Sequence, residues 1–180
     1  MHSIKYCLGA TLLMIGLNAN SACWAEAAQQ YSVDPVLLMA IGWKESRGHI
    51  GSIGPRLKDG NQAIGLMQIN TIHLQMLSRY GITKDQLFDP CVSQKVGAFV
   101  LADCIKRFGQ TWKAVGCYYG GPASKAYTAM RIYTNDVRRY YYGYMRLIQN
   151  GQLSSQNQIA STQIESIKAS PLLGTSMIWK

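Results

Sequence analysis

The sequence predicts a compact, mainly α-helical domain, and three observations support that prediction. Apolar residues recur at helical spacing along most of the chain. No Asn-Gly or Asp-Gly pair lies between alternating apolar and polar runs, so no β-hairpin is expected. Apolar residues make up 48% of the 180 residues and charged residues only 15%. That composition predicts one domain with a core plus extensions, and it excludes a disordered chain.

The first predicted helix begins at Pro35, because Asp34 is a favoured N-cap and Pro suits the first helical position. Gly48 is expected to end this helix. Residues 51–64 are rich in Gly and predict an irregular loop or a small sheet. Residues 65–80 are predicted to begin as a buried turn and to continue as a helix that stops at the next Gly.

The second half of the chain predicts three further helices. Residues 89–109 begin with Asp-Pro and end with Gly, and residues 111–119 form a short helix before a Gly-Gly-Pro break. Residues 123–149 predict one long aromatic-rich helix, or two. Residues 151–180 are rich in Gln, Ser, Thr and Asn, which predicts a poorly ordered tail. The compact domain is therefore expected to span residues 23–150.

Residues 1–22 have the pattern of a secretory signal. Lys5 supplies a positive charge, residues 6–17 are apolar, and Ala-Asn-Ser at 19–21 resembles a cleavage site. The apolar run is short for a membrane span, which needs about 20 residues. We therefore expect export to the periplasm, with no stable membrane span after cleavage. An uncleaved N-terminal anchor is the alternative.

Signal cleavage removes Cys7 and leaves four cysteines, Cys23, Cys91, Cys104 and Cys117. An even number in an exported chain predicts two disulfides, and four cysteines allow three pairings. Cys104 and Cys117 are expected on consecutive helices that an antiparallel turn brings together, which leaves Cys23 to pair with Cys91. Four free thiols are the alternative.

Glu45 is a candidate general acid. Leu38 and Ile41 precede it by seven and four residues, so all three share one face of the predicted helix. Apolar surroundings and the negative end of the helix dipole both favour the protonated carboxyl near neutral pH. The alternative is a helix-end Glu that pairs with Lys44 or Arg47.

Two more motifs have the chemistry of a sugar site. In the run Gly-Leu-Met-Gln-Ile-Asn over residues 65–70, the amides of Gln68 and Asn70 can both donate to and accept from uncharged ligands. Tyr118 and Tyr119 form a phenol pair before the Gly-Gly break. Taken alone, the first motif is equally consistent with a buried turn and the second with core aromatics that end a helix.

These motifs, in their order and spacing, resemble the soluble lytic transglycosylase domain of the lysozyme-like superfamily. The resemblance rests on Glu45-Ser46, on residues 65–70 and on the Tyr-x-x-Gly of residues 118–121, and it covers residues 23–150. It implies an α+β lysozyme-like fold with a small β region beside a catalytic cleft. More narrowly, the chain resembles the small specialised members that accompany type III secretion, type IV pili and conjugation systems. The resemblance also supports the Cys23–Cys91 pairing.

The family implies a murein-cleaving enzyme with one catalytic acid, which corresponds to Glu45. Its substrate is the bond from N-acetylmuramic acid (MurNAc) to N-acetylglucosamine (GlcNAc), and the product is a 1,6-anhydro-MurNAc end. Met67, Gln68 and Tyr118 match positions that line the saccharide cleft. Ser46, Gly65 and Asn70 are expected to support the site. The expected partners are peptidoglycan strands and components of a secretion, pilus or conjugation machine.

The sequence departs from the family pattern at two positions. Many members have Asn where this chain has Tyr119, so a sugar contact there involves a phenol in place of an amide. Some specialised members carry an acid at the position of Ala63, which gives them a lysozyme-like pair of carboxylates. Asp59 is the nearest acid in the loop, and its register is wrong for that role. We therefore favour a transglycosylase over a lysozyme-type hydrolase.

Two function classes remain as alternatives. One is a non-catalytic glycan-binding or scaffold module, although such a protein would be expected to lose Glu45 first. The other is nucleic-acid binding, which the formal charge of +9 suggests and predicted export disfavours. We expect no cofactor, and no metal because His2, His49 and His73 lack ligand spacing. The excess positive charge, mostly within residues 106–146, is expected to meet an anionic cell wall.

Overall fold

The computed structural model describes residues 19–152. The predicted signal lies outside these residues except for 19–22, and the predicted tail lies outside them beyond 152, so both remain predictions. Within the described part the mainly α-helical fold is confirmed. Its long helices are α1 (Ala19–Tyr31), α2 (Pro35–Ser46), α4 (Pro90–Phe108), α5 (Trp112–Gly120) and α6 (Tyr127–Gln149).

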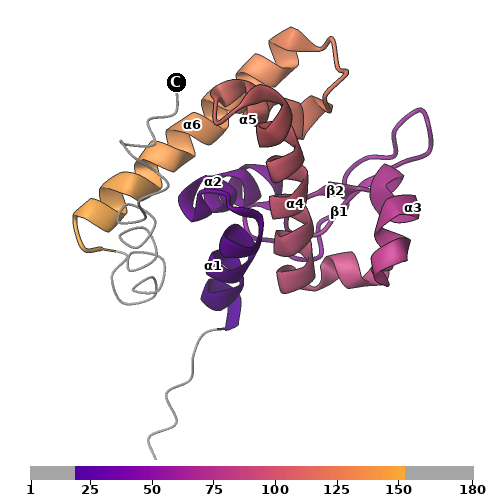
Figure 1. The fold of residues 1–180 in the computed structure, drawn as a ribbon, viewed down its shortest axis with the longest axis horizontal. Helices are drawn as coiled ribbons and strands as arrows, with labels where there is room; N and C mark the ends of the chain where they lie inside the picture. The colour runs from indigo at the N-terminus through magenta and orange to yellow at the C-terminus, as the bar shows by residue number, and fades with distance from the viewer. Residues whose placement is uncertain (1–18, 153–180) are drawn as a thin grey trace, which may run out of the picture.

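Along the sequence, a small region of turns, strands and short helices lies between α2 and α4, and in Figure 1 it is on the right, on the side of α4 away from α2. Two short strands pair antiparallel, with Ala63 opposite Asn70 and Ile64 opposite Ile69. The Asp59-Gly60 pair lies at the tip of the preceding loop, where Gly60 N donates to Leu57 O. The elements of this region are β1 (Ala63–Ile64), β2 (Ile69–Asn70), η1 (Thr71–His73), α3 (Leu74–Leu77), η2 (Ser78–Tyr80) and η3 (Asp85–Phe88).

The predicted single helix within residues 65–80 is wrong. Asn70 lies on β2 and its side chain accepts from Ile72 N, which starts a separate short 3₁₀ helix. Thr71 Oγ1 donates to Asn61 and accepts from Gln62 N, so it ties this segment to the loop before β1. These side-chain bonds compete with a continuous helix, which explains the break into short pieces.

The helix starts that depend on Asp caps are confirmed. Asp34 Oδ1 accepts from Val36 N at 2.8 Å and begins α2, and Asp89 Oδ1 accepts from Val92 N at 2.9 Å and begins α4. The predicted end of α2 at Gly48 is two residues late. The helix ends at Ser46, because Arg47 already has a left-handed conformation with φ of 55°.

Helix α1 was not predicted from the sequence, although it is rich in Ala, the residue with the highest helix propensity. Its buried residues include Cys23, Ala27 and Ala28. It packs mainly against α4, to which the Cys23–Cys91 disulfide also joins it.

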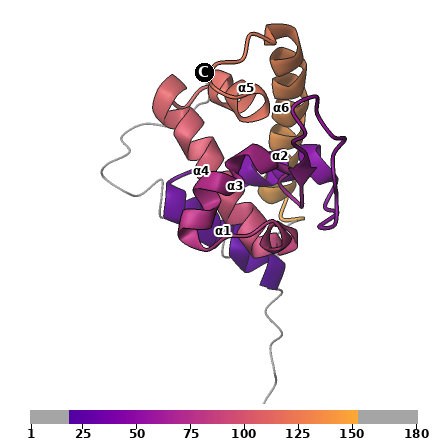
Figure 2. The same ribbon diagram turned by 90° about the vertical axis from the view of Figure 1, so that its right-hand side faces the viewer.

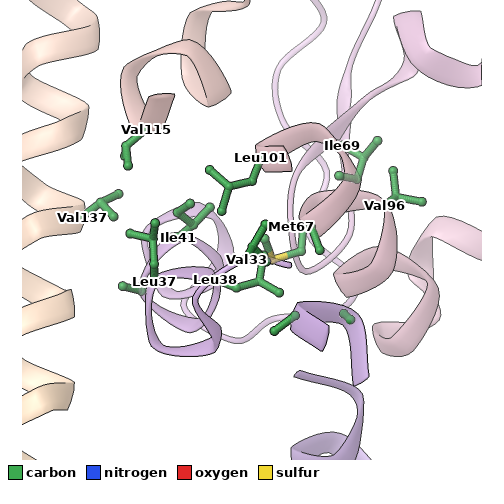
Figure 3. Close-up of a cluster of buried hydrophobic side chains, with 14 of the residues drawn as sticks. Val33, Leu37, Leu38, Ile41, Met67, Ile69, Val96, Leu101, Val115 and Val137 are labelled. Atoms are coloured by element: carbon green, nitrogen blue, oxygen red, sulfur yellow. The ribbon is translucent and has the colours of Figure 1, made fainter. Parts of the chain in front are cut away.

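Helix α2 is central to the arrangement, with α6 on one side and α1 and α4 on the other (Figure 1). In the turned view α5 lies near the upper end and α1 near the lower end, as in the first view (Figure 2). The core combines Leu37 and Ile41 of α2, Leu101 of α4 and Val137 of α6, and the Met67 side chain lies within this cluster (Figure 3). The end of α2 is thereby held between α6 and the strand region.

Both disulfides have the pairing that sequence analysis favoured, Cys23 with Cys91 and Cys104 with Cys117. The first spans 68 residues and the second 13 residues. On the chain-entropy model these loop lengths correspond to about 4 and about 3 kcal/mol of stabilisation. The first bridge ties α1 to the start of α4, and the second joins the end of α4 to α5.

Candidate active site

Glu45 lies in the last turn of α2, and Leu38 and Ile41 on the same helical face are fully buried. The Glu45 residue is only partly exposed. Burial raises the pKa of its carboxyl from 4.5 to about 7, although a hydrogen bond from Tyr133 and the charge of Lys44 both act to lower it. A carboxyl with a pKa near neutral can donate a proton and later accept one.

Tyr133 of α6 holds this carboxyl in place. Its hydroxyl donates to Glu45 Oε1 at 2.5 Å, and its ring is buried. Burial first and the nearby Glu45 charge second raise the pKa of the phenol well above its ordinary value. Sequence analysis missed Tyr133, because it lies 88 residues from Glu45 and is one of several tyrosines along α6.

The ion pairs of the alternative interpretation are not formed. Lys44 Nζ lies 2.6 Å from Asp136 Oδ2 on α6. The Arg47 guanidinium lies over the Tyr140 ring, 4.8 Å from its centroid. The basic neighbours of Glu45 are therefore engaged by α6, and the carboxyl has Tyr133 as its hydrogen-bond partner.

The turn after β1 is fixed against the chain around the start of α4. Gly65 has φ of 76°, and a Cβ atom there would overlap the Leu87 carbonyl oxygen. Met67 N donates to Ser93 Oγ of α4 at 3.1 Å. A glycine is thus required at position 65 both for the left-handed turn and for the close approach of two backbones.

Gln68 occupies the same turn with φ of 47° and is partly exposed. Its amide nitrogen donates to Ser52 O at 3.1 Å and to Gly65 O at 2.9 Å. Both amide hydrogens are therefore used inside the protein. The oxygen Oε1 is the atom that can accept a hydrogen bond from a ligand.

Met67 differs from its expected role. Sequence analysis placed it among the residues that line a saccharide cleft, but its side chain is fully buried. It packs between α2 and α4 because Gly42 and Gly97 leave space for it there. Its carbonyl oxygen accepts from the Tyr118 hydroxyl at 2.8 Å. Met67 therefore supports the site from behind and offers no side-chain surface to a sugar.

The two tyrosines at the end of α5 have different environments. Tyr118 is partly buried, and burial followed by the Glu45 charge raises the pKa of its phenol well above the ordinary value. Tyr119 is 51% exposed and stacks on Tyr133, with ring centroids 4.9 Å apart. Tyr119 thus presents an aromatic surface next to the residue that holds Glu45.

Ser46 and Asn70, the expected supporting residues, make local bonds. Ser46 Oγ donates to Gly42 O and accepts from Gly48 N, which closes the end of α2. Asn70 Oδ1 accepts from Ile72 N.

Asp59 is exposed and hydrogen-bonded within its own loop. Its carboxylate accepts from Asn61 N at 3.0 Å, and hydrogen bonds from Asn61 lower its pKa. The position at which some specialised family members carry an acid is Ala63, on β1.

A separate groove of about 220 Å³ lies along α2, and the candidate site residues do not line it. Its lining is mostly apolar and includes Trp24, Met39, Trp43, Ile50, Leu66 and Tyr144. Among residues 19–152, no helix is both long and apolar enough for a membrane span. Within the same range, no three His, Cys, Asp or Glu side chains are grouped as metal ligands would be.

The chain is similar in sequence to several known proteins. The chain is 38% identical over 129 residues to the invasion protein IagB of Salmonella typhimurium (strain SL1344), which corresponds to 69% of this chain and 80% of that protein. It is 38% identical over 143 residues to X polypeptide of Escherichia coli, or 77% and 84% of the two chains. It is 32% identical over 120 residues to protein IpgF of Shigella flexneri, or 66% and 78%.

Residues 22–139 match the family described as the transglycosylase SLT domain. The matched range contains Glu45, its partner Tyr133, the turn at residues 65–68 and both tyrosines of α5. Since this match spans well over half of the sequence, the chain belongs to the transglycosylase SLT domain family.

Proposed function

We propose that this protein is a peptidoglycan lytic transglycosylase. It cleaves the β-1,4 bond from MurNAc to GlcNAc and leaves a 1,6-anhydro-MurNAc end. The observation that carries the proposal is Glu45, a carboxyl with a pKa of about 7 that a buried tyrosine holds at the end of a core helix. Membership of the transglycosylase SLT domain family supports the same conclusion.

In the proposed reaction Glu45 acts twice. The protonated carboxyl donates its proton to the oxygen between the two sugars, and the bond from C1 of MurNAc to that oxygen breaks as an oxocarbenium-like centre develops. The carboxylate then takes the proton of the C6 hydroxyl of the same MurNAc, and the C6 oxygen bonds to C1. Glu45 is protonated again at the end, and no water is consumed.

The single-carboxyl arrangement favours this reaction over lysozyme-type hydrolysis. Hydrolysis by paired carboxylates needs a second acid across the scissile bond. Ala63 stands where some family members carry that acid, and Asp59 is bound within its own loop. An intramolecular hydroxyl is a sufficient nucleophile once the C1 centre has formed, because it is already held next to that centre.

Two residues are proposed to contact the glycan directly. Gln68 Oε1 accepts from a sugar hydroxyl or acetamido N–H, since its amide hydrogens are bound to Ser52 O and Gly65 O. The exposed face of Tyr119 packs against a sugar ring. Tyr118 and Met67 shape the wall behind them.

We further propose that the protein acts in the periplasm. Two disulfides are typical of an oxidising compartment, and residues 1–22 have the pattern of a secretory signal. The relative IagB is named an invasion protein. This name supports a role in which the enzyme opens the wall locally for a secretion, pilus or conjugation apparatus.

Mass spectrometry of digested peptidoglycan sacculi tests the proposed reaction. The wild-type protein is expected to release muropeptides with 1,6-anhydro ends, at a rate that falls as pH rises through about 7. Glu45→Gln is expected to release none, whereas the control Asp59→Asn keeps the wild-type products. Reducing ends would show a hydrolase instead, and binding without any product would show a glycan-binding module.

A further inference from the structure

A cation lies directly beside the proposed acid. Lys44 precedes Glu45 on α2, and its Nζ is 2.6 Å from Asp136 Oδ2 and 6.0 Å from the centroid of the Tyr133 ring. Tyr133 and Asp136 are three residues apart on α6, so both face the end of α2. One turn of α6 therefore supplies both the hydrogen-bond donor for the Glu45 carboxyl and the carboxylate that pairs with Lys44.

The groups around Glu45 come from three helices. Lys44 on α2 is the cation that acts on its carboxyl, Tyr133 and Asp136 come from α6, and Tyr118 comes from α5. Of the other nearby cations, Arg47 lies over Tyr140, and Arg139 contacts the second carboxylate oxygen of Asp136 at 3.3 Å. Lys44 is therefore the cation whose position matters for Glu45.

We propose that Asp136 is a positioning residue that holds the Lys44 ammonium against α6 and so prevents an ion pair between Lys44 and Glu45. The catalytic importance of this role rests on the proposed function. A Glu45 carboxyl that pairs with a lysine is ionised and cannot donate a proton to the substrate. Asp136 is the only acidic residue within residues 106–146, a segment with eight basic residues. Its carboxylate is in contact with the Lys44 ammonium.

The physical basis is the flexibility of lysine. Its ammonium sits on four rotatable methylenes and binds whichever carboxylate is within reach. Without Asp136, the ammonium can turn toward the Glu45 carboxyl, because Nζ lies 6.0 Å from the ring centroid of Tyr133, whose hydroxyl bonds that carboxyl. An opposite charge at contact distance favours the ionised form of Glu45. The Lys44 and Asp136 side chains are 27% and 28% exposed, so solvent screens their pair only in part.

A direct titration of Glu45 tests this proposal without substrate. The sequence contains only three glutamates, Glu26, Glu45 and Glu165, so ¹³C labelling of Glu side chains gives three carboxyl resonances. Glu45→Gln identifies the one that belongs to Glu45. In the wild-type chain it is expected to titrate near pH 7. Asp136→Asn is expected to lower that value by about 0.5 to 1 unit, and Asp136→Glu, which adds a fourth glutamate resonance, is expected to restore it.

A double-mutant comparison shows whether Asp136 acts through Lys44. Lys44→Met alone is expected to raise the Glu45 pKa, and Asp136→Asn in the Lys44→Met background is expected to shift it by less than half as much as in the wild type. An equal shift in both backgrounds, or no shift in Asp136→Asn, would overturn the proposal. Thermal unfolding followed by circular dichroism establishes that each variant is folded.

The matched control is Asp103→Asn, which removes a carboxylate from the salt bridge with Arg107 on α4 and is expected to leave the Glu45 titration unchanged. In the active enzyme, the alkaline limb of the rate profile in Asp136→Asn is expected to move to lower pH by the same amount as the Glu45 pKa. The titration needs no cleavage of substrate. Inactivity on sacculi would therefore disprove the proposed function, and the titration would still show whether Asp136 positions Lys44.

Discussion

The position of Glu45 has a consequence for stability as well as for reactivity. Its pKa is about 7 in the folded protein, against 4.5 for the ordinary carboxyl. Below pH 4.5 the group is protonated whether the chain is folded or not, so it has no effect. As pH rises from 4.5 to 7, the folded protein binds the proton more tightly than the unfolded chain, and the free energy of unfolding falls.

Glu45→Gln is therefore expected to stabilise the protein in a pH-dependent way. At pH 8 the free energy of unfolding should rise by about 1 to 3 kcal/mol relative to wild type, whereas at pH 4 it should change little. Urea unfolding at the two pH values measures this difference. If the difference in free energy of unfolding between the variant and wild type were the same at pH 4 and pH 8, the Glu45 carboxyl would not be buried as described.

At the residue scale, features with local signals could be predicted and features with long-range signals could not. The burial and raised pKa of Glu45 could be predicted because Leu38 and Ile41 lie on its own helix, within two turns. Tyr133 could not, because nothing in its sequence neighbourhood separates it from the other tyrosines of α6. Met67 was misplaced for the same reason, since only the approach of two glycine-containing helices shows that its side chain is buried.

At the scale of elements, the contact between α2 and α4 depends on glycine. A Cβ atom at Gly97 would lie 2.6 Å from Met67 Cε and 3.0 Å from its Cβ. Gly97→Ala is therefore expected to lower the free energy of unfolding by about 1 to 3 kcal/mol, because the core there has no free volume. Chemical denaturation followed by circular dichroism measures the change.

Gly143 provides the matched control on α6. It is also helical, but a Cβ atom there would meet nothing within 4 Å. Gly143→Ala is expected to stabilise the protein by about 0.5 to 1 kcal/mol, because Ala has the higher helix propensity. If both substitutions stabilised the protein, helix propensity and not packing against Met67 would govern both positions.

The elements that were predicted correctly are those whose ends are determined by contacts between residues close together in the sequence. Asp34 and Asp89 begin their helices through bonds to amides two or three residues ahead. The segment after β2 was predicted as one helix because its interruption depends on Thr71, which bonds to Asn61 ten residues earlier. Helix α1 was not predicted although its Ala content favours a helix, because its first four residues fall within the predicted signal at residues 1–22.

At the scale of the molecule, the charge predicts how the protein meets its proposed substrate. The formal charge is +9, and stem peptides give peptidoglycan free carboxylates. Binding of the inactive Glu45→Gln protein to intact sacculi is expected to weaken several-fold between about 50 and 300 mM NaCl, because salt screens exposed charges. Co-sedimentation measures the bound fraction.

Uncharged chitin oligosaccharides are the control ligand for this measurement. Their binding is expected to change little over the same range of salt, since it depends on groups such as Gln68 and Tyr119. Salt-independent binding to sacculi would show that the excess positive charge does not contribute to recognition of the wall.

The packing of Met67 against glycine also constrains how the sequence can change. Gly97 and Met67 share one volume, and Gly42 shares it as well, with Met67 Sδ 3.0 Å from a Cβ atom built there. A smaller residue at position 67 would leave a cavity, and a larger residue at position 97 would collide with Met67, so each substitution alone is destabilising. When both substitutions occur in one protein they compensate, and homologous proteins that differ at one of these positions are expected to differ at the other.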